Sequence, residues 1–300
     1  MRAVTIPIKN LMQHEPDEGL DFMPMPREMS TFEMPRAPEP GPGRDVAGAT
    51  QVLLRFTQLF EAGLAGSDEL PALDLARLPA PTLQVLNETL GEGEVSAIVG
   101  EGESLRIQET VFSGVWREQH FDAEGRLQHD FLLAAPVPPV LRQLADQAAS
   151  PRLREGAIPA GAMNVPALLS ELQEAMDLCG EDTPPHVVNL TLMPLSREDS
   201  DHLDALLDGG SVVILSRGFG NCRISSTAAR HVWRVQYFNN MQTLILNTIE
   251  VVALPEVRVG LMGDGFCTLP ARLAWTTGLV GAVCASGQGG SRCEHQRLRG

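Results

Sequence analysis

The chain has 300 residues, 43% of them hydrophobic, which is enough for two domains of ordinary size. Its net charge of −15 argues against nucleic acid as a partner, because phosphate binding depends on clustered Lys and Arg side chains. No run approaches the roughly 18 apolar residues that cross a bilayer, and no signal-like apolar segment follows Met1, so we expect a cytoplasmic protein without membrane insertion.

Residues 1–47 are rich in proline and show little periodicity, so we expect an extended or disordered arm. The arm contains the apolar segment Leu-Asp-Phe-Met-Pro-Met-Pro at 20–26. Because Met makes adaptable apolar contacts, two interpretations stay open for Phe22, Met23 and Met25. These side chains dock on the protein's own surface, or they form a short binding segment for a partner.

From residue 48 onward the chain repeats itself. When residues 73–121 are slid by 117 positions onto residues 190–238, 15 of 49 positions are identical, whereas chance gives about 3 or 4. The densest match is Val-Trp-Arg-x-Gln-x-Phe, at 115–121 and again at 232–238. We therefore predict a tandem duplication, with a first repeat at 48–140, a connector at 141–164 and a second repeat at 165–257.

Each repeat is predicted to contain the same elements in the same order. A helix comes first, at 52–65 and 165–178, and a strand at 187–192 precedes a second helix that begins after the N-cap Ser196 and ends at Leu207. Strands then follow at 211–216, at 223–227 leading into 231–238, and at 243–254. The predicted fold class is α+β: two α-β-α-β-β-β modules with antiparallel sheets and helices on one face.

The most unusual local sequence is the loop Arg217-Gly218-Phe219-Gly220-Asn221-Cys222. Its glycines, beside Arg and Asn, suit a backbone nest for an anion or a partner carboxylate, and they equally suit a tight turn between strands. Cys222 is either activated by the neighbouring Arg223 or a small buried residue. The equivalent stretch of the first repeat, 100–104, lacks Arg, Asn and Cys, so we expect partner binding at the loop of the second repeat.

Trp233 and Arg234 are adjacent on a predicted strand, so their side chains point to opposite faces. One interpretation is a buried Trp beside an Arg that pairs with a carboxylate. The other is an aromatic and guanidinium surface that binds a partner.

The sequence offers no catalytic, metal-binding or cofactor-binding motif. The five cysteines are scattered without a C-x-x-C pair, and the histidines lack metal-ligand spacing. No nucleophile motif or phosphate-binding glycine motif is present. We therefore expect a protein that is not an enzyme and that has no catalytic residue, metal site or cofactor.

Three stretches resemble the hydrogenase expression/formation proteins of the HupH/HyaF/HoxQ type. They are residues 17–26, residues 214–224 with the Ser-Arg-Gly-Phe-Gly-Asn-Cys loop, and residues 232–251 with Val-Trp-Arg-Val-Gln-Tyr-Phe. The resemblance implies an accessory protein for maturation of an uptake or membrane-bound [NiFe]-hydrogenase. It also implies that the small, iron–sulfur subunit and a thioredoxin-like hydrogenase chaperone are partners, and it carries over no catalytic residue.

The leading hypothesis is a holding chaperone that covers the small subunit until its cofactors are in place. The alternative is a metal or iron–sulfur delivery protein that uses Cys222, Cys179 and a nearby His. A third hypothesis, an enzyme acting on a protein thiol, requires a low pKa at Cys222. Residues 258–300 change abruptly to an Arg-, Gly- and Cys-rich composition, which is typical of a shifted reading frame or a divergent end.

Overall fold

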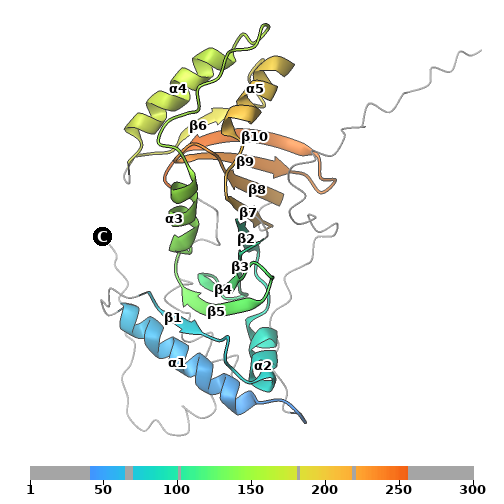
Figure 1. Ribbon diagram of the computed structural model, residues 1–300. Coiled ribbons are helices and arrows are strands. Elements are labelled where there is room, and N and C mark those ends of the chain that lie inside the picture. Colours follow the sequence, from blue (N-terminus) through green and yellow to red (C-terminus); the bar gives the residue numbers. More distant parts are fainter. Residues whose placement is uncertain (1–40, 65–69, 101–102, 181–182, 218–220, 256–300) are drawn as a thin grey trace, which may run out of the picture.

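The structure is a computed structural model that describes residues 41–64, 70–100, 103–180, 183–217 and 221–255 (Figure 1). Residues 22–25 of the arm and residues 258–300 lie outside this part of the chain. In the described residues, no helix is both long and apolar enough to span a bilayer. The elements of the first repeat are α1 (Val46–Leu64), β1 (Ala72–Asp74), α2 (Ala80–Leu90), β2 (Val95–Val99), β3 (Leu105–Glu109), β4 (Val115–Phe121) and β5 (Leu127–Ala134).

The second repeat has the same order of elements. They are α4 (Val165–Leu178), β6 (His186–Asn189), α5 (Arg197–Leu207), β7 (Val212–Ser216), β8 (Asn221–Ser226), β9 (Val232–Phe238) and β10 (Leu244–Val251). Each repeat therefore reads α-β-α-β-β-β-β, and the prediction of three strands after the second helix was wrong. The segment predicted to run from 223 to 238 is two antiparallel strands, because the Thr227 hydroxyl binds Ala229 N and His231 turns the chain with φ of 63°.

The ten strands form one antiparallel sheet, in the order β1-β5-β4-β3-β2-β7-β8-β9-β10-β6. The prediction of antiparallel pairing is confirmed, but the two expected sheets are joined through β2 and β7. Ala97 pairs with Ile214, which is the same position of the other repeat. The two halves are thus related by an approximate two-fold axis that passes between these two residues, as in a symmetric dimer.

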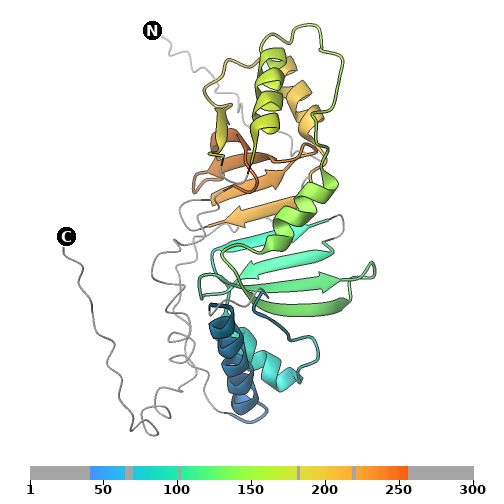
Figure 2. The same cartoon turned by 90° about the vertical axis from the view of Figure 1, so that its left-hand side faces the viewer.

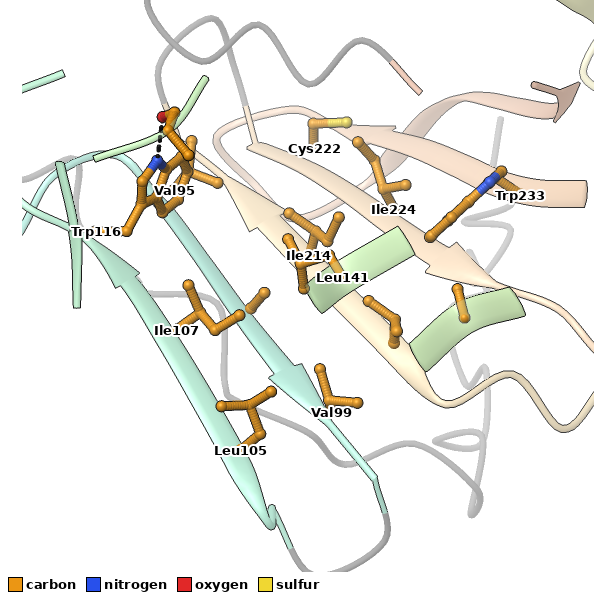
Figure 3. Close-up of a cluster of buried hydrophobic side chains, with 14 of the residues drawn as sticks. Val95, Val99, Leu105, Ile107, Trp116, Leu141, Ile214, Cys222, Ile224 and Trp233 are labelled. Atoms are coloured by element: carbon orange, nitrogen blue, oxygen red, sulfur yellow. Dashed lines mark hydrogen bonds between the residues drawn. The ribbon is translucent and has the colours of Figure 1, made fainter. Parts of the chain in front are cut away.

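Helices cover both faces of this sheet, whereas the sequence predicted one. The pairs α1–α2 and α4–α5 pack on the same face, each over the outer strands of its own half. The fifth helix, α3 (Pro139–Ala148), begins at the end of the predicted first repeat, continues into the predicted connector and crosses the opposite face where the halves meet (Figure 2). There Leu141 and Ala145 of α3 join a core cluster that contains Trp116 and Trp233 (Figure 3).

The N-terminal helix starts earlier than expected. α1 begins at Val46 rather than at 52, because the Asp45 carboxylate accepts a hydrogen bond from Gly48 N and caps the first turn. The same carboxylate accepts a hydrogen bond from the hydroxyl of Thr82 on α2, at 2.7 Å. In the second repeat, α4 has the predicted bounds, and Ser196 caps α5 as predicted.

The start of α5 is tied to the start of α4 by one buried carboxylate. Asp199 forms a capping box with Ser196 and also accepts the N–H groups of Met163, Asn164 and Val165, at 2.8–3.0 Å. Burial raises the pKa of this carboxyl, but the hydrogen bonds from Val165, Ser196 and Asn164 outweigh burial and hold it well below its usual range. Asp199 occupies the position of Thr82, so both repeats bridge their two helices at this point.

We predict that Asp199→Asn lowers the melting temperature at pH 7, because an amide has one acceptor oxygen whereas both oxygens of Asp199 accept backbone N–H groups. Because the folded-state pKa of Asp199 is depressed, its carboxylate stabilises the fold at pH values above its pKa in the unfolded chain, about 3.9. This stabilisation is lost as the pH falls below that value. The difference in melting temperature between Asp199→Asn and the wild type should therefore become smaller between about pH 5 and pH 2. Thermal unfolding followed by circular dichroism measures it. The control is Asp201→Asn on the exposed face of α5. An equal loss in both variants would contradict this role of Asp199.

Candidate functional site

The predicted loop lies at one end of the second repeat, which we call the motif end. Here β7 ends, β8 begins, β9 ends and β10 begins. The register aligns Ser216 with Cys222, Asn221 with Phe238, and Phe238 with Leu244. Residues 218–220 lie outside the described part of the chain, so the structure places Arg217, Asn221 and Cys222 but not Gly218, Phe219 or Gly220.

Arg217 lies at the seam between the repeats. Its backbone N–H donates to Glu94 O at 3.0 Å, and its guanidinium Nη2 donates to Gly93 O at 3.4 Å. The side chain is half-buried, so part of the guanidinium remains accessible to a partner. Gly100 holds the equivalent position of the first repeat, so the first repeat has no counterpart of this cation.

Cys222 is a core residue. It is 6% exposed and belongs to the same cluster as Trp116 and Trp233. Burial raises the pKa of its thiol to about 11, against the effect of a hydrogen bond with Tyr237. Cys179 packs against a different cluster, under α4, and burial raises its pKa too. The two thiols therefore do not form a shared site, and the described residues contain no group of three His, Cys, Asp or Glu side chains arranged for a metal.

Trp233 and Arg234 have structural roles. Trp233 is 2% exposed and donates from Nε1 to Val252 O at 3.2 Å, just as Trp116 donates to Ala135 O at 3.0 Å. Arg234 pairs with Asp204 of α5 and Asn247 of β10, at 2.6 and 3.2 Å. The interpretation of a buried Trp beside an ion-paired Arg therefore accounts for both side chains.

The matching arginine in the first repeat confirms how closely these sites correspond. Arg117 binds Asn87 of α2 and Asp130 of β5, which are the repeat equivalents of Asp204 and Asn247. In the first repeat the helix supplies the amide and the strand supplies the carboxylate, and in the second repeat the helix supplies the carboxylate and the strand supplies the amide. Each Arg therefore binds one carboxylate and one amide. Such compensation is expected where a half-buried guanidinium keeps a carboxylate partner.

At the corresponding end of the first repeat, the β4–β5 turn is closed by its own charges. Asp122 accepts hydrogen bonds from Arg126 and Gln128, and Arg126 also pairs with Glu124. The backbone N–H of Arg126 and these side chains hold the pKa of Asp122 below its usual range. This end of the first repeat therefore offers polar groups that already have partners.

The β9–β10 turn has the same backbone but different side chains. Asn239 replaces Asp122 and accepts the N–H groups of Met241 and Thr243, and Gln242 takes the left-handed conformation of Gly125. Glu124 and Gln128 of the first repeat are replaced by Met241 and Ile245, whereas Leu127 corresponds to Leu244. Met241, Leu244 and Ile245 are 86%, 43% and 57% exposed and stand where the first repeat has Glu124, Leu127 and Gln128.

We call Met241, Leu244 and Ile245 the tip patch. The adjoining loop after β6 carries Leu192, which is 80% exposed, and Thr191 of that loop binds Asn247 N at 2.8 Å. The sequence prediction missed this patch. The signal that reveals it is the repeat comparison itself, which puts Met241 opposite Glu124 and Ile245 opposite Gln128.

A second residue missed from sequence is Glu109, on the first-repeat side of the seam. It is 4% exposed, and its carboxyl accepts Gly114 N at 3.4 Å. Burial, reinforced by the charge of Glu94, raises the pKa of Glu109 to about 7. Its backbone carbonyl binds Gly93 N, so Glu109 and Arg217 both hold the start of β2.

We predict that Cys222 is unreactive in the folded protein. With a pKa of about 11, its thiolate fraction at pH 8 is on the order of a hundredfold below that of a free thiol. Iodoacetamide labelling followed by peptide mass spectrometry should show modification of Cys222 only after unfolding. Rapid labelling of the native protein at Cys222 would instead support the hypothesis of an enzyme acting on a thiol.

We predict that Glu109→Gln stabilises the protein at pH 8. Because the folded-state pKa of Glu109 is raised, the neutral acid stabilises the fold fully at pH values below the unfolded pKa of about 4.5. This stabilisation is lost as the pH rises through about 7. Gln keeps the neutral form, so the gain should be about 1–3 kcal/mol at pH 8 and near zero at pH 4. Urea unfolding at both pH values measures the gain in stability, with the exposed Glu92→Gln as control. An equal gain at both pH values would exclude titration of Glu109 as its cause.

Comparison with known proteins identifies the family. The sequence model of the HupH hydrogenase expression protein, C-terminal conserved region, matches the chain twice, at 48–156 and 162–264. The hydrogenase expression/formation protein HupQ of Azotobacter chroococcum is 41% identical over 84% of this chain and 89% of its own length. HoxQ of Cupriavidus necator is 43% identical over 80% and 85%, and the hydrogenase-1 operon protein HyaF of Escherichia coli is 34% identical over 63% and 66%. The chain therefore belongs to the HupH family of hydrogenase expression/formation proteins.

Proposed function

We propose that the protein is a cytoplasmic accessory chaperone of [NiFe]-hydrogenase maturation, which holds the iron–sulfur small subunit until its cofactors are complete. Its relatives are named hydrogenase expression/formation proteins, which supports a role in hydrogenase maturation. A thioredoxin-like hydrogenase chaperone is the second partner in this proposal. The small subunit binds at the motif end of the second repeat.

The main observation behind the proposal is that the motif end of the second repeat differs from the corresponding end of the first repeat, which carries the β4–β5 turn. In the first repeat, the side chains of Arg126 and Gln128 donate hydrogen bonds to Asp122, so these polar groups of the turn already have partners within the turn. The second repeat keeps the same turn but presents exposed apolar side chains and the half-buried cation of Arg217. Exposed apolar groups beside a cation are typical of a protein interface, where apolar contact gives affinity and charge gives orientation.

The chemistry of the described residues supports holding rather than catalysis or metal delivery. A thiol that delivers metal must be deprotonated and accessible, whereas burial keeps Cys222 protonated. Cys179 packs in another cluster and offers Cys222 no second ligand. At the motif end, the exposed apolar side chains of the tip patch and the half-buried guanidinium of Arg217 suit binding of a polypeptide.

We predict that Arg217→Ala weakens binding of the hydrogenase small subunit by about 1–3 kcal/mol, or roughly 5- to 150-fold, because a charge-assisted contact is lost. The melting temperature should fall only slightly, since the guanidinium's contact to Gly93 O is long, at 3.4 Å. Binding is measured by co-purification with tagged small subunit and by titration of the purified proteins.

The matched control is Arg126→Ala, which removes an exposed Arg from the equivalent end of the first repeat and should leave binding unchanged. Unfolding of Arg217→Ala would make Arg217 a structural residue. If the wild-type protein never co-purifies with a hydrogenase subunit, the proposed function is wrong.

A further inference from the structure

The tip patch is open on the outer side of β10. The edge strand β6 pairs only with Thr248–Val251 and then leaves the sheet, after Leu190 N donates to Asn247 O. Leu244 and Leu246 pair with β9, Ile245 lies in a β-bulge between them, and no described strand lies on the outer side of these residues. An open strand edge that carries exposed apolar side chains is a ready binding site for an extended polypeptide segment.

The equivalent edge in the first repeat is protected by polar side chains. Gln128, which has the place of Ile245, is held by Asp122 at 2.7 Å, and His129 contacts Asp74 at 3.3 Å. Charged and polar side chains are a common means of preventing unwanted pairing at a strand edge. Because the second repeat has lost this protection at the same positions, an occupant of apolar character is expected there.

We infer that residues 22–26 of the chain's own N-terminal arm bind the tip patch in an extended conformation. The segment Phe-Met-Pro-Met-Pro supplies apolar side chains that match Met241, Leu244 and Ile245. Met fits irregular apolar surfaces because its side chain is unbranched and polarisable. The small subunit is proposed to bind the same end of the second repeat, so in this inference the arm occupies the tip patch in the free protein and the partner displaces it. The contact within the chain does not depend on which hydrogenase subunit is bound.

The two prolines select an edge position for this segment. Pro24 and Pro26 disfavour a helix and lack an N–H group, so the segment cannot lie between two strands. They alternate with Met23 and Met25, and in an extended chain alternate residues point their backbone groups to opposite sides. Met23 and Met25 can therefore pair with β10 while both prolines face away from the sheet. The segment closes the edge without creating a new one.

The covalent link favours this occupant over a free peptide. Residues 27–40 connect the segment to the described chain and reach about 48 Å when extended. The start of α1 lies at the far end of the first repeat, whereas the β9–β10 turn belongs to the second repeat (Figure 1). The helix α1 packs over β5, and β5 lies about 34 Å from β10 at the usual strand spacing, so the linker is long enough to span this distance. A covalent link that can span this distance makes the contact intramolecular and raises the effective concentration of the segment above that of a free peptide in solution.

Hydrogen–deuterium exchange of the full-length protein tests the inference. The variant Phe22→Ser/Met23→Ser/Met25→Ser should exchange faster than the wild type in peptides covering 244–247, on the order of tenfold. Peptides covering 127–130 of the first repeat should be unchanged. A control variant, Met29→Ser/Phe32→Ser/Met34→Ser, alters apolar residues elsewhere in the arm and should behave as the wild type.

The reciprocal experiment replaces the tip patch with residues of the first repeat. Met241→Glu/Ile245→Gln should increase chymotrypsin cleavage after Phe22, whereas Leu127→Gln in the first repeat should not. Identical exchange at 244–247 in the wild type and the triple variant would overturn the inference. Protection that grows with protein concentration would also overturn it, because the occupant would then be a second copy of the chain.

Discussion

Five backbone pairs, from Val95–Ser216 to Val99–Val212, join β2 to β7 and make one sheet of two repeats. Each strand would otherwise be the open edge of a five-stranded sheet, and pairing them removes both edges at once. The pairing also brings the two tryptophan faces side by side. A single helix, α3, then covers Trp116 and Trp233 together through Leu141 and Ala145. A lone repeat would lack half of this core, so the two repeats depend on each other for folding.

This internal dimer has a property that a true homodimer lacks, because its halves can change separately. Core positions changed little, as the equivalent hydrogen bonds of Trp116 and Trp233 show. Around the half-buried Arg117 and Arg234 the repeats differ in a compensated way, with Asp130 and Asn87 in one and Asn247 and Asp204 in the other. A partly buried guanidinium is more stable with a carboxylate partner, so loss of one carboxylate favours gain of the other. An exposed turn carries no such requirement.

Local and repeated patterns were predictable from sequence, whereas long-range choices were not. The bounds of α4 follow from the periodicity of its apolar residues. The cap of α5 follows from the ability of the Ser196 hydroxyl to accept a backbone N–H group. The pairing of β2 with β7 depends on segments more than 110 residues apart, and no local signal specifies it. The helix α3 begins in a proline-rich stretch that suggested a connector, and its buried face exists only because both sheet halves are present. At the loop, sequence placed Arg217 correctly at a strand end, but burial of Cys222 depends on packing across three strands.

Comparison of the β4–β5 turn with the β9–β10 turn distinguishes residues that the fold needs from residues that a binding function explains. Both turns share the same hydrogen bonds and the same left-handed residue, at Gly125 and at Gln242. Gln in this conformation costs more than Gly, so the fold itself favours the residue of the first repeat. Exposing Met241 and Ile245 to water likewise adds nothing to the stability of the hairpin. The second repeat has Met241 and Ile245 where the first has the polar Glu124 and Gln128, and a bound polypeptide, from the arm or from a partner, is the physical gain that offsets this exposure.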